Sequence, residues 1–495
     1  MSWPSSIVGS SDWGTRGGRD AREGGEMVVR GAGQLTLGEV VLFGQVVPEV
    51  EALMDPVLRR IDRLLEDEAL VDQVVEALGR RHPHSRCRGR RGTPAEVVLR
   101  LLVLKHLKGW SYDQLEWEVT GNLVYRRFCR IEGAKVPDAK TLVRLGQVLE
   151  GPVLRGLFER IVEQAVEQRV TRGRRMRVDT TVVEAPIRHP TDSGLCEDAV
   201  RVLTRSARRL SQAGVALPFR LRDVKRSVSR RMREIGQALR RRGDAAKEAI
   251  KTPYRKLLRV TGRRVREAQR ALQAAREQLP GLGARAQRRV ARLVEGLETM
   301  LPRAQQVVRQ TRARVLRGET KSPDKLISLF EPEAEILRRG KLHRPTEFGR
   351  LVKVQESENG IVSDVAVVPE KNDAPLLVPA IERHIERFGR APRMAATDRG
   401  FYSTEGERKI RELGVHHAVI PKPGYRSRER IEYERQRWFR RGRAWRAGGE
   451  ARIARLKRCF DMARSRYHGP AGMDRTVYWA AISNNLVAIA TRSPP

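Results

Sequence analysis

The sequence predicts a mixed α/β protein in which an all-α N-terminal domain precedes a sheet-forming core, and a long helical insertion interrupts that core. Three observations predict this architecture. Apolar residues recur at helical spacing before residue 170, and short segments rich in β-branched residues begin near 174 and return after 322. Between these segments lies an arginine-rich stretch with helical periodicity. Strands that alternate with helices further along the chain are typical of a mixed α/β core.

The N-terminal part divides into two segments. Residues 1–46 are rich in Gly, Ser and Arg and lack the apolar stretch of a signal peptide, so we expect a disordered or poorly structured segment. Residues 47–170 contain short helical patterns joined by polar turns; Thr93 and Pro94 open one such helix and Gly109 ends it. Short helices with many arginines favour a helix-turn-helix-like DNA-binding domain, although a small helical bundle with a solvated basic surface fits equally well.

The core is expected in two pieces, residues 171–200 and 321–490. The first piece contains a short β-branched strand whose end carries Asp179. The second contains extended segments joined by a Glu-Asn-Gly turn, then a helix, a buried strand that ends at Asp398, another strand, and a helix that carries Glu450. Two strand ends and one helix therefore contribute carboxylates to the same core.

Residues 201–320 form the insertion between the two pieces. They contain 33 Lys and Arg against 9 Asp and Glu, which is +24 of the net charge of +38 for the whole chain. Apolar residues at helical spacing predict helices that are interrupted at residues 280–283. We expect a helical hairpin or coiled coil that presents a basic face to a phosphate backbone, with an inert helical spacer as the alternative.

The overall charge indicates the class of partner. A net charge of +38 attracts polyanions and argues against an enzyme that acts only on small molecules. Nucleic acid is the first partner to consider, ahead of an anionic membrane surface or an acidic protein. The longest apolar runs are too short to span a membrane, and the four cysteines are not paired as in a disulfide framework or zinc site. We expect no membrane association and a reducing, cytoplasmic location.

Three carboxylates stand in an order that suits phosphodiester chemistry. Cleavage by water or by a 3′-hydroxyl uses two metal ions, and Mg²⁺ prefers hard oxygen ligands at rigid positions such as strand ends. Asp179 and Asp398 meet this requirement if their strands are neighbours, and Glu450 can complete the site from a helix. Glu184 and Asp192 remain alternatives to the first aspartate.

Three separated motifs carry a resemblance to a known family. They are VDTTVVEAPIRHPTDSGLCEDAVRVL at residues 178–203, ATDRGFYS at 396–403, and the segment from RAGGEARIARLK to AAISNNL at 446–486. In this order they resemble insertion-sequence transposases of the DDE class, in particular ISNCY-like and related groups. The resemblance spans about residues 90–200 and 320–490 and implies a ribonuclease-H-like catalytic core, with a helical domain before it.

The resemblance assigns the catalytic residues. It makes Asp179, Asp398 and Glu450 the catalytic and metal-binding triad, with Mg²⁺ or Mn²⁺, two ions, as the cofactor. The family's spacing of Arg, Glu and Lys selects Glu450 over three neighbouring glutamates, Glu429, Glu432 and Glu434.

The same resemblance assigns residues that contact DNA. Arg446 and Lys457 keep the family's spacing around the glutamate, and steps of four and seven bring all three within reach of one helix face. They are therefore expected to hold phosphates beside the metals. The family's Tyr is replaced by Arg443, which puts an aromatic stacking role there in doubt. Arg399 and Tyr402, which follow the second aspartate, are expected to touch DNA.

Two tryptophans in the basic run before the glutamate allow two interpretations. Trp438 and Trp445 are suited to stack on unpaired or flipped bases. Alternatively, they anchor this loop to the core, and this second interpretation is favoured because aromatic side chains usually pack.

The function implied by the resemblance is DNA transposition. Such an enzyme cleaves the ends of an insertion sequence and joins the freed 3′-hydroxyl to target DNA. Its partner is double-stranded DNA, both the terminal inverted repeats and the target, and it acts as a homodimer or larger synaptic complex at the bacterial nucleoid. The alternatives are a domesticated DNA-binding protein that no longer cuts, and a ribonuclease-H-like nuclease without strand transfer.

Overall fold

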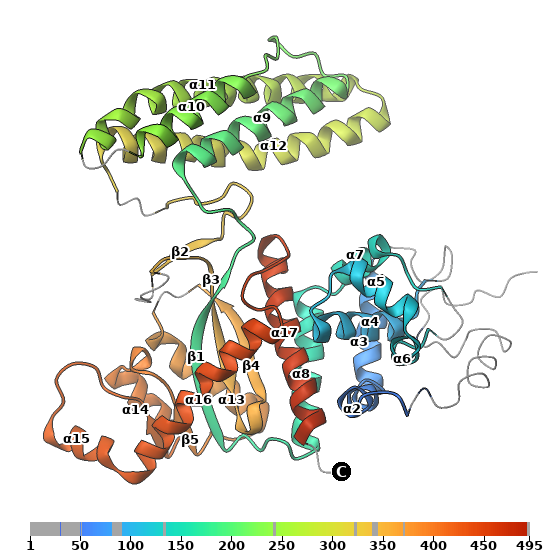
Figure 1. The fold of residues 1–495 in the computed structure, drawn as a ribbon, viewed down its shortest axis with the longest axis vertical. Helices are drawn as coiled ribbons and strands as arrows, with labels where there is room; N and C mark the ends of the chain where they lie inside the picture. Colours follow the sequence, from blue (N-terminus) through green and yellow to red (C-terminus); the bar gives the residue numbers. More distant parts are fainter. Residues whose placement is uncertain are drawn as a thin grey trace, which may run out of the picture. The chain divides into compact units, whose positions relative to one another are not determined.

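The computed structural model describes residues 30, 50, 52–81, 92–131, 135–240, 244–320, 324–338, 345–369 and 372–492 (Figure 1). The expectation of a disordered or poorly structured segment at residues 1–46 lies outside the described residues, apart from Arg30. The chain divides into two compact units. The first comprises residues 1–54, 65–102 and 112–149, and the second comprises residues 55–64, 103–111 and 150–495.

The first unit is helical in the part that the structure describes. It contains α3 (Glu68–Arg80), the first part of α4 (Ala95–Lys108), α5 (Tyr112–Gly121), α6 (Leu123–Phe128) and α7 (Ala139–Val148). Short polar side chains begin three of these helices, because Asp67, Asn122 and Asp138 accept hydrogen bonds from the backbone of α3, α6 and α7. As predicted, helix α4 ends just before Gly109. This residue has a φ of 68°, a value that glycine adopts readily.

The second unit is built on a mixed sheet. Among the described residues this sheet has six strands, namely β1 (Arg175–Glu184), β2 (Glu335–Leu337), β3 (Glu347–Glu356), β4 (Val362–Val368), β5 (Met394–Ala396) and β6 (His417–Val419). Their order is β2-β3-β1-β5-β6, and β4 also pairs with β3. Strand β3 is antiparallel to β1, β2 and β4, whereas β5 is parallel to β1 and β6. The predicted mixed α/β fold class is confirmed.

A hairpin joins β3 and β4 through the predicted Glu-Asn-Gly turn. Asn359 and Gly360 turn the chain with φ of 58° and 81°, values that Asn and Gly tolerate best. The carboxylate of Glu358 accepts hydrogen bonds from the backbone N–H groups of Arg174 and Arg175 at 2.7 and 2.9 Å. The turn therefore anchors the start of β1, the strand on which the candidate site is built.

Helices cover both faces of the sheet. The helices of this unit outside the insertion are α2 (Pro56–Leu64), α8 (Gly151–Glu167), α13 (Leu377–Phe388), α14 (Thr404–Glu412), α15 (Arg428–Arg435), α16 (Arg437–Cys459) and α17 (Gly469–Arg492). Met176, Val178 and Val182 of β1 pack in one apolar cluster with residues of α13 and α14. The other face of the sheet receives α16, which contacts β1, β5 and β6. In the described part of the chain, no helix combines the length and apolarity that a membrane crossing requires.

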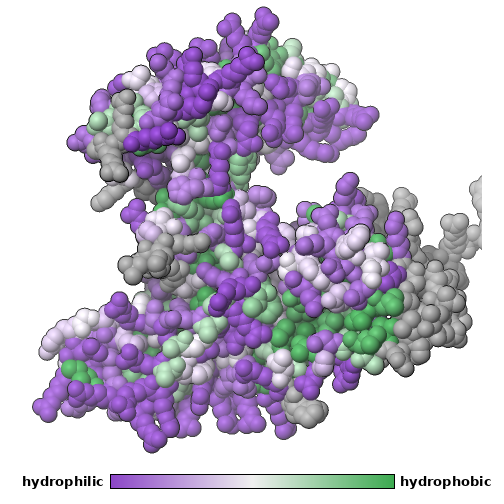
Figure 2. Space-filling view, viewed as in Figure 1, coloured by the Kyte–Doolittle hydropathy of each residue, from purple (hydrophilic) through white to green (hydrophobic). Residues whose placement is uncertain are grey.

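The insertion contains more helices than the sequence pattern indicated. Within described residues 192–240 and 244–320 it has four long helices, α9 (Asp192–Gln212), α10 (Lys225–Ala238), α11 (Asp244–Gln278) and α12 (Ala284–Thr311), which share an apolar cluster of their own (Figure 1). The predicted interruption at residues 280–283 falls between α11 and α12. A helical hairpin or coiled coil was expected from residue 201, but α9 begins at Asp192, within the predicted first piece of the core, and together with α10 it completes a bundle. Hydrophilic side chains cover most of its visible face (Figure 2).

Candidate active site

The register of the sheet brings Asp179 and Asp398 together. Strands β1 and β5 run parallel, and their last pair is Arg177 with Ala396. Asp179 lies two residues beyond Arg177, and Asp398 lies two residues beyond Ala396. Because side chains alternate between the faces of a sheet with a period of two, both aspartates project on the face that α16 covers.

The position of Asp179 within its strand differs from the prediction. Strand β1 extends from Arg175 to Glu184, so Asp179 lies in its middle and not at its end. Pairing with β3 continues as far as Glu184 and keeps β1 extended. Strand β5, in contrast, stops at Ala396, just before Asp398. The two aspartates are therefore neighbours at the point where the short strand ends beside the long one.

Arg446 on α16 connects the three predicted carboxylates. Its Nη2 atom lies 2.9 Å from Asp179 Oδ2 and 3.8 Å from Asp398 Oδ2, and its Nη1 atom lies 3.3 Å from Glu450 Oε1. The side chains of Asp179 and Asp398 are 17% and 30% exposed, whereas that of Glu450 is 71% exposed. One guanidinium thus supplies the counter-charge for two partly buried aspartates and one solvent-facing glutamate.

Backbone N–H groups orient both aspartates in the same way. Thr180 N donates to Asp179 Oδ1 at 2.8 Å, and Gly400 N donates to Asp398 Oδ1 at 2.9 Å. In each carboxylate one oxygen is held by the adjacent backbone and the other, Oδ2, lies toward Arg446. This arrangement limits rotation of both carboxylates and directs one oxygen of each to a common cation.

The donor atoms gathered around Arg446 are carboxylate oxygens, the ligand type that hard divalent cations prefer. Mg²⁺ and Mn²⁺ are bound by carboxylate oxygens, and the Oδ2 atoms of Asp179 and Asp398 both lie within 3.8 Å of Arg446 Nη2. As the side chains stand, no group of three or more His, Cys, Asp or Glu among the described residues has an arrangement that could hold a metal ion. The guanidinium of Arg446 itself lies between these carboxylates, at the position to which their negative charge attracts a cation.

A fourth carboxylate, Asp373, lies next to this site and was missed by the sequence reasoning. Its Oδ1 atom accepts a hydrogen bond from Thr180 Oγ1 at 2.7 Å. A Cβ atom placed on Gly400 would lie 3.0 Å from Asp373 Oδ2, which locates Asp373 beside the loop of Asp398. Its only sequence signal is an Asp before Ala-Pro at a helix start, which is an ordinary capping pattern.

A buried chain of charged groups fixes α16 against β1. Arg177 donates to both oxygens of Glu356 at 3.0 and 2.6 Å, and Arg452 Nε lies 3.3 Å from Glu356 Oε1. Arg452 also donates to Asn484 of α17 at 3.0 Å, and the Arg177 guanidinium lies 4.7 Å from the Trp445 ring. These contacts flank Arg446 and Glu450 on both sides along α16, so they set the depth and rotation of the helix over the two aspartates.

The predicted DNA-contacting residues have different surroundings. Arg399 is exposed beside Asp398 and forms no ion pair with any residue that the structure describes. Lys457 Nζ donates to the carbonyl oxygen of Val182 on β1 at 2.7 Å, so it helps to hold α16 on the sheet. Tyr402 is half-buried and packs against the apolar cluster beneath α13 and α14.

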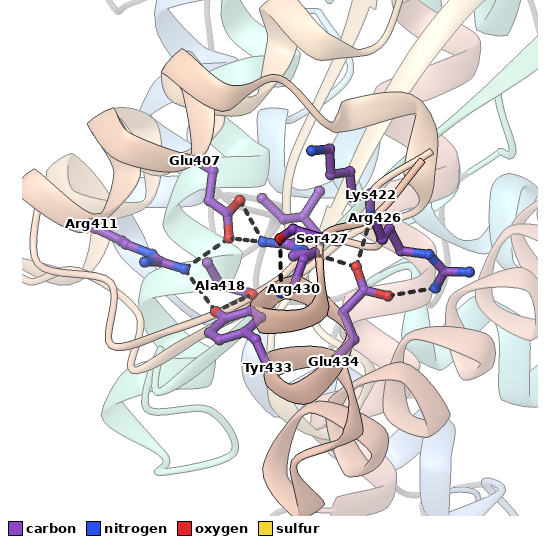
Figure 3. Close-up of polar contacts among 10 residues, drawn as sticks. Glu407, Arg411, Ala418, Lys422, Arg426, Ser427, Arg430, Tyr433 and Glu434 are labelled. Atoms are coloured by element: carbon purple, nitrogen blue, oxygen red, sulfur yellow. Dashed lines mark hydrogen bonds and ion pairs between the residues drawn. The ribbon is translucent and has the colours of Figure 1, made fainter. Parts of the chain in front are cut away.

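An ion network stabilises the segment that follows β6 (Figure 3). Arg430 on α15 lies between Glu407 and Glu434, and donates to Glu407 Oε1 and Oε2 at 2.9 and 2.8 Å and to Glu434 Oε1 at 2.9 Å. Its guanidinium also lies 5.3 Å from the Tyr402 ring and 4.9 Å from the Tyr433 ring. The network joins α15, α14 and the loop after Asp398 into one supported region.

The alternative carboxylates lie elsewhere. Glu434 belongs to the α15 network, Glu432 lies 3.4 Å from Arg428, and Glu429 is exposed. Asp192 begins α9 and lies 2.9 Å from Arg314 of the insertion. Glu184 is at the far end of β1, and its odd offset from Asp179 places it on the opposite face of the sheet.

Both tryptophans contribute to packing. Trp438 stacks on His417 with ring centroids 4.4 Å apart and meets Tyr433 edge-on at 5.2 Å. Trp445 is covered by Arg177, and both tryptophans pack against the cluster of Ala396, Val419 and Phe439. These contacts favour the interpretation that they anchor this part of the chain to the sheet.

Comparison with known proteins adds one finding. Residues 48–147 match the family described as "Transposase domain (DUF772)". This segment covers α2 to α6 and all but the last residue of α7. No curated protein and no solved structure matches the chain. The N-terminal part of the chain is therefore similar to a transposase domain, which supports a DNA-processing enzyme.

Proposed function

We propose that the protein is a DNA transposase of the DDE type, with Asp179, Asp398 and Glu450 as its catalytic and metal-binding residues in a ribonuclease-H-like core. The observation that carries the proposal is the convergence of these carboxylates on the guanidinium of Arg446. They come from a strand, a loop and a helix that are far apart in the sequence. The similarity of residues 48–147 to a transposase domain supports the same function.

The residues of the site suit phosphodiester cleavage and transesterification. Two Mg²⁺ or Mn²⁺ ions, when bound, activate the attacking water or 3′-hydroxyl and neutralise charge on the in-line transition state. Asp179 and Asp398 would hold them with carboxylate oxygens already oriented by backbone N–H groups, and Glu450 would add a ligand from the solvent side. The forked guanidinium of Arg446 would bind phosphate oxygens of the scissile strand beside them.

The basic parts of the chain would hold the DNA. The insertion carries +24 of the net charge, and the N-terminal helical domain would bind the terminal inverted repeats. Arg399, exposed beside Asp398, would contact the backbone near the cut, whereas Lys457 and Tyr402 would support the elements that meet the DNA. Two element ends and a target must be held together, so we propose a homodimer or larger synaptic complex.

The test is end cleavage by Asp398→Asn. This substitution keeps the shape of the side chain but removes the charge that a divalent cation needs. We expect Mg²⁺-dependent, EDTA-sensitive cleavage of linear DNA bearing the element's inverted repeats to fall at least about 10³-fold, with DNA binding in EDTA unchanged. Glu429→Gln, which removes an exposed charge on α15, should cleave normally. Cleavage by Asp398→Asn at the unsubstituted rate would refute the proposal.

Two rival functions lead to different outcomes in the same assays. A domesticated DNA-binding protein would bind the repeats but would not cut them with either metal. A ribonuclease-H-like nuclease would cut DNA but would not join a pre-cut 3′ end to a target. A transposase should do both, so the formation of joint molecules from a pre-cut end distinguishes it from each rival.

A further inference from the structure

Asp373 occupies a helix-cap position without acting as a cap. It precedes the short 3₁₀ helix η5 (Ala374–Leu376), where an Asp side chain ordinarily accepts hydrogen bonds from the first turn, yet it makes no such bond. Its Oδ1 atom instead accepts from Thr180 Oγ1 at 2.7 Å. Thr180 is only 4% exposed, so this hydrogen bond is shielded from water. The carboxylate is therefore directed away from its own helix and toward β1.

The second oxygen of Asp373 lies against Gly400. A Cβ atom at Gly400 would be 3.0 Å from Asp373 Oδ2 and 3.2 Å from Asp398 Oδ1, so the two carboxylates flank the same glycine. The N–H of Gly400 orients Asp398, and the N–H of Thr180 orients Asp179. Asp373 thus forms a hydrogen bond with Thr180 and lies next to Gly400, the two residues whose backbone N–H groups orient the aspartates.

We propose that Asp373 is a positioning residue for the aspartate pair, an inference that rests on the proposed function. Strands β1 and β5 are paired only as far as Arg177 and Ala396 in this described part of the sheet. Asp179 and Asp398 lie beyond that pair, where the ladder no longer sets their separation. The bridge through Asp373 joins the two chain segments at this point and keeps the aspartates in register.

The bridge predicts a graded response to substitution. Asp373→Ala removes the hydrogen bond with Thr180 and the carboxylate beside Gly400, whereas Thr180→Val removes only the hydroxyl donor and keeps the side-chain shape. Asp373→Asn keeps an oxygen that can accept from Thr180 Oγ1. Groups that orient metal ligands typically change metal affinity by about 10–100-fold when they are removed. The first two substitutions should therefore weaken metal binding, and the third should largely preserve it.

The experiment measures Mn²⁺ binding to the full chain by isothermal titration calorimetry, without DNA or turnover. We expect Asp373→Ala and Thr180→Val each to weaken Mn²⁺ binding by about 10-fold or more. The double variant should bind Mn²⁺ no more weakly than the weaker-binding of the two single variants, because the two substitutions remove the same bridge. The Mn²⁺ affinity of Asp373→Asn should remain within about threefold of that of the unsubstituted chain. Glu429→Gln should bind Mn²⁺ as the unsubstituted chain does. Circular dichroism confirms folding, and Thr180→Val keeps the test decisive if Asp373→Ala does not fold.

The outcomes separate this inference from the proposed function. Mn²⁺ binding that Asp398→Asn abolishes but that Asp373→Ala and Thr180→Val leave unchanged would overturn the positioning role alone. A loss with Asp373→Asn as large as with Asp373→Ala, while Thr180→Val binds normally, would also overturn it, because Asp373 would then act as a direct ligand. Absence of Mn²⁺ binding in the unsubstituted chain, together with DNA cleavage by Asp398→Asn, would refute the proposed function itself.

Discussion

Replacement of Arg446 by Gln tests whether the guanidinium is the counter-charge that holds the site together. Arg446→Gln keeps a polar side chain of similar length but leaves Asp179, Asp398 and Glu450 without the cation they share. We expect local stability around α16 and β1 to fall in EDTA. We also expect divalent cations to restore more stability to the variant than they add to the unsubstituted chain, because the guanidinium no longer competes with them.

The expected loss of local stability follows from the three contacts that Arg446 makes. The pair with Asp179 is a charged hydrogen bond at 2.9 Å between side chains 17% and 21% exposed, a class that contributes about 1.5–3 kcal/mol. The contact with Asp398, at 3.8 Å and more exposed, adds about 1 kcal/mol of screened attraction. Glu450 is 71% exposed and one helical turn away, so it adds about 0.3–0.5 kcal/mol. The expected loss of local stability is therefore about 3–4.5 kcal/mol, mostly from the pair with Asp179.

Hydrogen exchange of peptides from α16 and β1 measures this local free energy directly. A divalent cation at about 100 times its dissociation constant should return about 2.7 kcal/mol to the variant. Arg446→Lys keeps the charge but loses the forked guanidinium, so its local stability should lie between those of Arg446→Gln and the unsubstituted chain. Arg443 is an exposed arginine on the same helix, and Arg443→Gln should leave the exchange unchanged. Equal exchange in EDTA for Arg446→Gln and the unsubstituted chain would refute the reasoning.

Three further predictions concern stability and DNA binding. Burial lowers the pKa of His384 to about 4, so between pH 6.5 and pH 4 the unfolded chain takes up a proton that the folded chain does not. The free energy of unfolding, measured by chemical denaturation, should therefore fall by about 3 kcal/mol from pH 6.5 to pH 4. His384→Gln should make the free energy of unfolding less dependent on pH in this range. Glu356→Gln leaves the buried Arg177 and the half-buried Arg452 with a neutral partner and should destabilise the fold by about 3 kcal/mol in the same assay; a loss under 1 kcal/mol would contradict a stabilising role of these ion pairs. Arg205, Arg208 and Lys225 line one surface pocket of the insertion, and replacement of each by Gln should reduce the slope of log K against log salt for DNA binding by about 0.9; unchanged slopes would show that this face does not meet phosphate.

Local features of this protein were predictable from its sequence. The β3–β4 turn at residues 358–360, the end of α4 at Gly109 and the helix that carries Glu450 all depend on neighbouring residues. Turn residues and helical periodicity depend on only a few neighbouring residues, so they can be recognised without knowledge of the tertiary structure. The mixed α/β class followed from the same local signals. The order of the motifs, together with the family spacing of Arg446, Glu450 and Lys457, also grouped Asp179, Asp398 and Glu450 as one predicted site.

Only the tertiary structure decided how these residues meet. The pairing of Arg177 with Ala396 sets Asp179 beside Asp398, and a slip of one residue would turn either aspartate to the opposite face. Such a register depends on packing across the whole sheet and on pairing with β3, which also extends β1 beyond its expected end. The bridging positions of Arg446 and Asp373 follow from that register, since a contact between residues distant in the chain leaves no periodic pattern in the sequence.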